Sequence, residues 1–168
     1  MADVLITFDS NAYYSDAVAA KQAPLADAPR SIMLAASNVD PKGLDTLKAT
    51  SGAARITFDP TKLALPLQET KRQVANLAII CVGKTTKKYD ANLTASKSAK
   101  TATFKIEDGL AMSNAGALQG AAAALPLNAL VSLNMNQPFV LEIDRTGVAT
   151  ELKQLFDVVL YLEYIASF

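Results

Sequence analysis

The stretch of residues 157–165 constrains the fold of this chain most strongly. It reads Asp-Val-Val-Leu-Tyr-Leu-Glu-Tyr-Ile, nine residues of mainly β-branched, aromatic and leucine character without glycine or proline. Alternate residues of a strand point to opposite faces, and both faces of this stretch are mostly apolar. We therefore expect a central β-strand that is buried on two sides.

Further strand patterns follow one another along the chain, separated by turn-forming residues. The stretch 74–82 is apolar on both faces and is the expected partner of 157–165. Residues 38–43 predict a turn, 109–125 a long loop and 146–154 a helical turn. The other predicted strands cover residues 4–8, 31–36, 54–58, 92–95, 101–107, 127–133 and 139–143.

Eight or nine short strands separated by turns are typical of an all-β protein. We predict an antiparallel β-sandwich of about eight strands, with a jelly-roll or related Greek-key topology. The 168 residues are expected to form a single domain. Within it, residues 1–43 contribute an N-terminal strand and an extended arm, because Pro24 and Pro29 interrupt helix formation.

Residue types that many enzymes need are missing from the sequence. The chain contains no histidine, which excludes Ser-His-Asp and Cys-His catalysis and the usual zinc sites. Gly83-Lys84-Thr85 looks like the end of a phosphate-binding loop, but Ala78 stands where that loop needs its first glycine. We therefore expect a protein that is not an enzyme and that has no metal or cofactor site.

Charge and hydropathy indicate which partners the chain would suit. Sixteen basic and sixteen acidic side chains give a formal net charge of zero, so no overall field attracts nucleic acid or an anionic membrane. The apolar share, 51%, is high; part of it is alanine, and the rest favours a surface that packs against a partner. Cys81, the one cysteine, lies in an apolar run and is expected to be a buried hydrophobic side chain.

No apolar run reaches the length of about 18 residues that a membrane span needs, and the N-terminus does not resemble a signal peptide. We expect a soluble protein that is made in the cytoplasm and is compatible with incorporation into a released particle. Its final location stays open.

Six residues are the candidates for contact with a partner: Tyr13, Tyr14, Pro24, Pro29, Lys87 and Lys88. The two tyrosines follow the first predicted strand, in a polar stretch that suits a protein or a sugar. The two prolines belong to the arm, which would reach a neighbouring molecule. The two lysines belong to a lysine-rich loop, which is read first as a solvated face that protects an edge strand. A patch for an acidic partner or nucleic acid is the alternative.

Two segments resemble a known family. Ala54–Phe58 followed by residues 72–83, and Phe139–Ile143 followed by residues 156–165, resemble the C-terminal β-sandwich of the large A components of bacterial insecticidal toxin complexes. The resemblance covers residues 44–168 and implies a β-sandwich that docks another protein of its complex without catalysis. Residues 1–43 have no counterpart in it, and the giant α-helical shell and pore of those toxins are missing, so no toxic activity is implied.

The leading hypothesis is a non-catalytic structural or interaction subunit that packs into a larger assembly. That assembly could be a homo-oligomeric particle or a toxin-type or injection-type complex, so its partners are copies of the chain or a larger machine. One alternative is the jelly-roll subunit of a virion or capsid. The other is a lectin-like, carbohydrate-binding β-sandwich, against which the absence of tryptophan counts.

Overall fold

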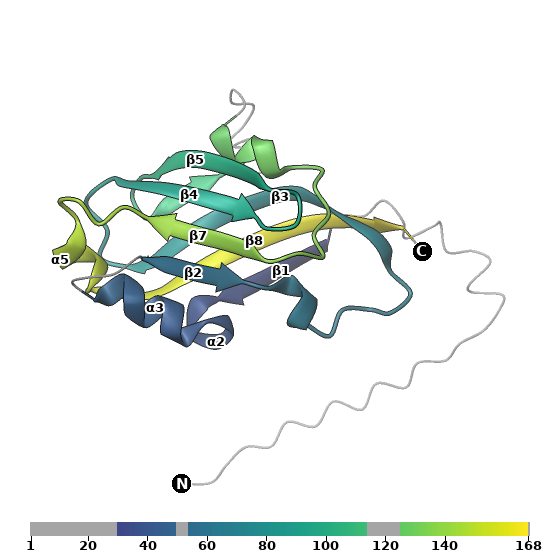
Figure 1. Cartoon of the computed structure of the whole chain (residues 1–168), viewed down its shortest axis with the longest axis horizontal. Helices are drawn as coiled ribbons and strands as arrows, with labels where there is room; N and C mark the ends of the chain where they lie inside the picture. The colour runs from purple at the N-terminus through teal and green to yellow at the C-terminus, as the bar shows by residue number, and fades with distance from the viewer. Residues whose placement is uncertain (1–29, 50–53, 114–124, 168) are drawn as a thin grey trace, which may run out of the picture.

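Two four-stranded sheets pack face to face in the computed structural model, which describes residues 30–49, 54–113 and 125–167 (Figure 1). Sheet A has the strand order β1-β8-β3-β6, and sheet B has the order β2-β7-β4-β5. All strand pairs are antiparallel. The strands are β1 (Arg30–Ala35), β2 (Arg55–Phe58), β3 (Thr70–Gly83), β4 (Tyr89–Ala95), β5 (Lys100–Ile106), β6 (Leu110–Met112), β7 (Phe139–Ile143) and β8 (Leu155–Ser167).

The connections follow the path of a jelly roll. Successive strands alternate between the two sheets, except that β4 and β5 form a hairpin within sheet B. The last strand, β8, lies between β1 and β3, and the second-last strand, β7, lies between β2 and β4. This is the order of two Greek keys wound into an eight-stranded sandwich. The predicted fold class and the predicted pairing of 74–82 with 157–165 are confirmed.

The core lies between the inner faces of the two sheets. On β8 the inward side chains are Val158, Leu160, Leu162 and Tyr164, each at most 2% exposed. Alternating residues of β2, β4 and β7 face them, as the period of two predicted. Complete burial of one leucine side chain contributes about 2 kcal/mol, so this double layer accounts for much of the stability of the fold.

The expected burial of β8 on both faces is wrong. Val159 and Tyr161 are only half-buried, and Ile165 is 41% exposed. On the neighbouring strand β3, Val82 is also 41% exposed. Each sheet of an antiparallel sandwich has one face toward the core, and no described element covers the other face of sheet A.

The predicted turn at 38–43 is two short helices, α2 (Ala36–Val39) and α3 (Pro41–Lys48). The Asp40 carboxylate accepts a hydrogen bond from the Gly43 amide at 3.0 Å and from the Thr57 amide of β2 at 2.8 Å. Proline at the first position of α3 costs no hydrogen bond there and presets the helical φ. Turn-type residues thus cap a helix and tie it to sheet B.

The predicted strand 127–133 is also wrong, because the 3₁₀ helix η3 (Pro126–Leu130) occupies this part of the chain. Pro126 begins the helix, and Leu127 and Leu130, three residues apart, both enter the core. The 3₁₀ helix η2 (Pro60–Lys62) follows β2 and likewise begins with a proline. The expected helical turn is confirmed as α5 (Ala149–Leu152).

The predicted strand 4–8 and most of the arm, including Tyr13, Tyr14, Pro24 and Pro29, lie outside the described residues. The described chain begins with Arg30, the first residue of β1. β6 is short and falls within the stretch that was expected to be a loop.

Candidate interaction surfaces

The outer face of sheet A is apolar across all four strands. Its central rows follow from the strand register, because residues directly paired across neighbouring strands point to the same side. The first row is Met33, Tyr161, Ala78 and Met112, and the second row is Ala35, Val159, Ile80 and Leu110. Val82 and Ile165 extend the face along β3 and β8. We define these ten side chains as the outer face of sheet A.

Polar side chains bound this face at both ends of β8. The Glu163 carboxylate accepts hydrogen bonds from Asn76 Nδ2 at 2.7 Å and from the Tyr161 hydroxyl at 2.8 Å. The bond to Glu163 raises the pKa of Tyr161. At the other end, the Asp157 carboxylate accepts bonds from the Ser37 amide and hydroxyl at 3.0 and 2.5 Å. Both carboxylates have hydrogen-bond partners within the chain. The two rows at the centre of the face therefore offer a neighbouring molecule mainly apolar side chains.

The outer face of sheet B has the opposite character, with polar side chains bonded to each other across its strands. Lys105 Nζ pairs with Asp90 at 2.6 Å, and Arg55 pairs with Glu142. Hydroxyl and amide groups continue the pattern. Thr94 and Thr101 are bonded at 2.9 Å, and Thr103 donates to Asn92 at 2.7 Å.

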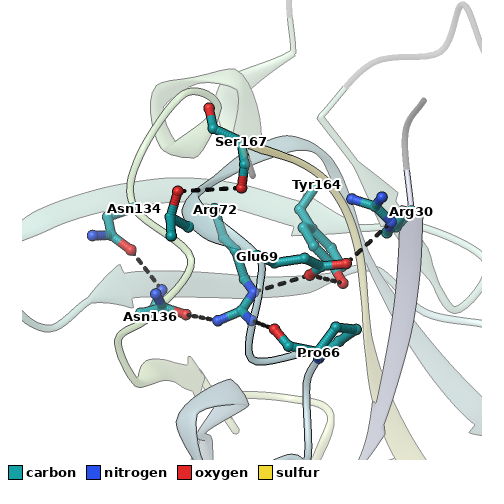
Figure 2. A network of polar contacts seen from close by, with 9 residues as sticks. Arg30, Pro66, Glu69, Arg72, Asn134, Asn136, Tyr164 and Ser167 are labelled. Carbon is teal, nitrogen blue, oxygen red and sulfur yellow. Dashed lines mark hydrogen bonds and ion pairs between the residues drawn. The ribbon is translucent and has the colours of Figure 1, made fainter. Parts of the chain in front are cut away.

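A buried carboxylate links several strands at the end of the sandwich where β1 starts (Figure 2). The Glu69 side chain is 2% exposed and accepts from three directions. Arg30 Nε and Arg72 Nε each lie 3.1 Å from its oxygens, and the Tyr164 hydroxyl donates at 3.0 Å. Arg72 Nη2 also donates to the Pro66 carbonyl at 2.5 Å. Burial is the main cause that raises the pKa of Tyr164, and the hydrogen bond to Glu69 raises it further.

A second carboxylate holds the loop between β3 and β4. Glu151 of α5 accepts from the Tyr89 hydroxyl at 2.5 Å, from the Thr86 amide and hydroxyl at 2.6 and 2.8 Å, and from the Lys87 amide at 3.1 Å. Led by the Tyr89 bond, these donors lower the pKa of Glu151 to about 2. Burial and the same carboxylate raise the pKa of Tyr89.

The two predicted lysines both lie in this loop, directly before β4. Lys87 Nζ donates to the Gly147 carbonyl at 2.7 Å, and Lys88 Nζ pairs with Glu107 at 2.8 Å, which raises the pKa of Lys88. Lys97 and Lys100 lie in and just after the β4–β5 turn, at the other end of β4. Seven strand residues span about 20 Å, so the lysine-rich sequence is spread along the sandwich. A contact of Lys87 and Lys88 with a partner stays a prediction.

Cys81 faces the core of the sandwich, where it is 6% exposed. Burial raises the pKa of its thiol to about 12, so the thiolate is not formed near neutral pH. The expectation of a buried hydrophobic side chain is confirmed.

Within the described ranges, no group of three or more acidic, cysteine or histidine side chains is placed to hold a metal ion. No helix in the same part of the chain is long and apolar enough to cross a membrane.

Sequence reasoning missed the residues that form the outer face of sheet A, among them Met33, Ile80 and Met112. The signal was present, because residues 157–165 are apolar on both faces. That pattern predicts burial within one molecule, whereas no element of the described ranges covers the second face.

The sandwich is similar to part of a known structure. A chain in the cryo-EM structure of Yersinia pseudotuberculosis TcaA-TcaB superposes with a TM-score of 0.57 over 87% of this chain, at 12% sequence identity. The match spans about 10% of that chain's length, so it shows a shared fold for one part of a much larger protein. The sequence matches no family model and no curated protein.

Proposed function

We propose that this protein is a non-catalytic structural subunit that packs into a larger protein assembly through the outer face of sheet A. The observation that carries the proposal is the pair of apolar rows that crosses all four strands of this sheet. Met33 is 64% exposed there, and Val82 and Ile165 are each 41% exposed. Contiguous apolar surface on a sheet is costly in water and typically marks an interaction site.

Two further observations support the proposal. Residues 44–168 resemble the partner-docking sandwich of toxin-complex A components, and the fold is shared with a chain of TcaA-TcaB. A toxin-type or injection-type particle would use such a subunit, and a virion shell would use a jelly roll in the same way. In each of these assemblies, the outer face of sheet A would be the apolar surface that a neighbouring protein covers.

The test is the mass of the purified protein in solution, measured by light scattering after size exclusion over a concentration series. We expect a discrete species heavier than one chain. The variant Val82→Lys with Ile165→Lys places two charges on the outer face of sheet A, and we expect its mass to fall toward that of a single chain. Charge on the face is costly only if the face becomes buried.

The matched control is Thr57→Lys with Thr101→Lys on the outer face of sheet B, which adds the same charge to a polar surface. We expect the control to keep the mass of the unaltered protein. If both double variants keep it, the outer face of sheet A is not the interface. If the unaltered protein is a single chain at all concentrations, self-assembly through the outer face of sheet A is excluded.

The carbohydrate-binding alternative gains little from the structure. Sugars stack on exposed aromatic rings, and among the described aromatic side chains only Phe156 is exposed, at 76%. A glycan array would still test this alternative directly.

A further inference from the structure

The strand β1 is an edge of sheet A that lacks the usual protection against pairing. It is hydrogen-bonded to β8 on one side, and the described residues place no strand on the other. Every second residue of such an edge points its amide and carbonyl away from the sheet, which makes a template for a further strand. Edge strands in proteins are normally blocked by charge, proline, a bulge or short length.

The other three edges have such protection. β6 has three residues and β2 has four. β5 begins with Lys100 and carries Lys105 on its outer side. In contrast, β1 has six residues, its register with β8 is regular, and Arg30 is its one charged residue. The Arg30 guanidinium is held by Glu69 at 3.1 Å, at the very start of the strand.

One segment of the chain has the pattern to complete this edge. Residues 1–29 precede β1, and within them Val4–Phe8 is predicted to be a strand. The other ranges outside the described residues, 50–53 and 114–124, are rich in alanine, glycine and polar residues and predict no strand. A strand added beside β1 would continue the apolar rows that start at Met33 and Ala35.

The length of the connection favours an exchange between two molecules. Residues 9–29 separate Val4–Phe8 from β1, and a hairpin needs about two to five residues. A connection of more than about 15 residues is unusual within one small domain. Its prolines favour an extended chain, and 21 extended residues reach about 70 Å. Such a connection suits a strand that pairs with a neighbour.

We propose that the edge of β1 accepts the Val4–Phe8 segment of a second copy of this chain, which adds to sheet A as a further strand. The inference rests on the proposed function and specifies how copies are held together. Backbone hydrogen bonds would provide the pairing, and the continued apolar rows would provide the register.

Disulfide trapping tests the pairing in the full-length protein. One chain carries Met33→Cys, and a second carries a single cysteine at each position from 4 to 8 in turn. Residues paired across neighbouring strands have Cα atoms about 4.5–5.5 Å apart, within the range of a disulfide. The native Cys81 does not compete, because it is buried. After mild oxidation, disulfide-linked pairs of chains are counted by non-reducing electrophoresis and mass spectrometry.

We expect linked pairs at alternate positions of the segment, in about tenfold or greater excess over a control with Thr101→Cys in place of Met33→Cys. A chain with both cysteines should form links between chains. Links only within that chain would show that the segment pairs with its own β1, and no excess at any position would show that it does not pair there. Either result overturns the inference.

A second variant separates this inference from the proposed function. Ile6→Pro removes an amide and blocks the strand, and we expect it to reduce the assembly to single chains without changing the thermal unfolding of the sandwich. Ala2→Pro, outside the predicted strand, is the control. If Ile6→Pro keeps the unaltered mass while Val82→Lys with Ile165→Lys loses it, the exchange fails and the proposed function stands.

Discussion

The two outer faces of the sandwich are built on the same backbone plan and have opposite chemistry. Across sheet B, side chains bond to each other in charged and hydroxyl pairs such as Lys105 with Asp90 and Thr94 with Thr101. Across sheet A, the corresponding rows are apolar from β1 to β6. Each face is the non-core side of a four-stranded antiparallel sheet, so position in the fold does not explain the difference.

The difference indicates that the outer face of sheet B is better suited to contact with water than that of sheet A. Cross-strand polar pairs satisfy one another and keep contact with solvent, at little cost or gain in stability. An apolar row gains nothing in water and gains about 25 cal/mol for each Å² that a partner covers. The comparison therefore supports the proposed function, in which water covers the outer face of sheet B and a protein partner covers that of sheet A.

The largest effect that we expect separates the two sides of β8. Leu160 is fully buried in the core, and Leu160→Ala should lower the free energy of unfolding by about 2–5 kcal/mol. Val159→Ala, on the outer face of sheet A, should lower it by less than about 1 kcal/mol in the single chain. Urea unfolding at low protein concentration measures both. Equal losses would show that the outer face is covered within one molecule.

Next in size is the buried network at the end of the sandwich. Glu69→Gln leaves Arg72 and Arg30 without their carboxylate, and we expect a loss of about 3 kcal/mol. Glu107→Gln, which breaks the exposed pair with Lys88, is the control and should cost less than about 1 kcal/mol. Chemical denaturation compares the two variants. A loss no larger than that of the control would mean that surface pairs matter as much as this buried one.

The third prediction concerns the loss of folding stability at low pH. The donors around Glu151 lower its pKa from the ordinary 4.5 to about 2, so its ionised form stabilises the folded state. That contribution is complete above pH 4.5 and is lost as the pH falls toward about 2. We expect the Glu151→Gln variant to unfold at a lower temperature at neutral pH and to lose less on acidification in this window. Thermal unfolding across the window measures this, and parallel curves for variant and parent would contradict it.

The smallest effect should come from the outer face of sheet B. Lys105→Ala removes the exposed pair with Asp90 and should change the free energy of unfolding by less than about 1 kcal/mol, and by less still at high salt. Unfolding at two salt concentrations measures it. A larger, salt-sensitive loss, or a change in assembly mass, would break the assignment of this face to solvent.

Local sequence patterns predicted most strands. They failed where a proline or a capping side chain starts a short helix. Alternation located β2, β5 and β7 to within one or two residues, because each has one apolar face. It failed at 127–133, where Pro126 starts a helical turn that sends two leucines into the core. The turn expected at 38–43 became part of α2 and α3, because Asp40 caps the second helix and binds β2.

The polar networks could not be found from the sequence. Glu69, Arg30 and Tyr164 meet at one point although they are far apart along the chain, and no spacing marks them. No sequence spacing marks the Glu151 cluster either, because the Thr86 and Lys87 donors lie in a loop more than sixty residues earlier. Such clusters exist only because the crossing connections of the sandwich bring distant loops to the same end.

The class of fold follows from the amino-acid sequence, since the period of two and the turn residues are local properties that a single chain segment carries. The tertiary structure alone decided which apolar face of β8 is inside. Strands 157–165 and 74–82 are apolar on both sides. The position of sheet B buries one side, and no described element packs on the other. Burial depends on what packs against a face, and that is a property of the whole arrangement.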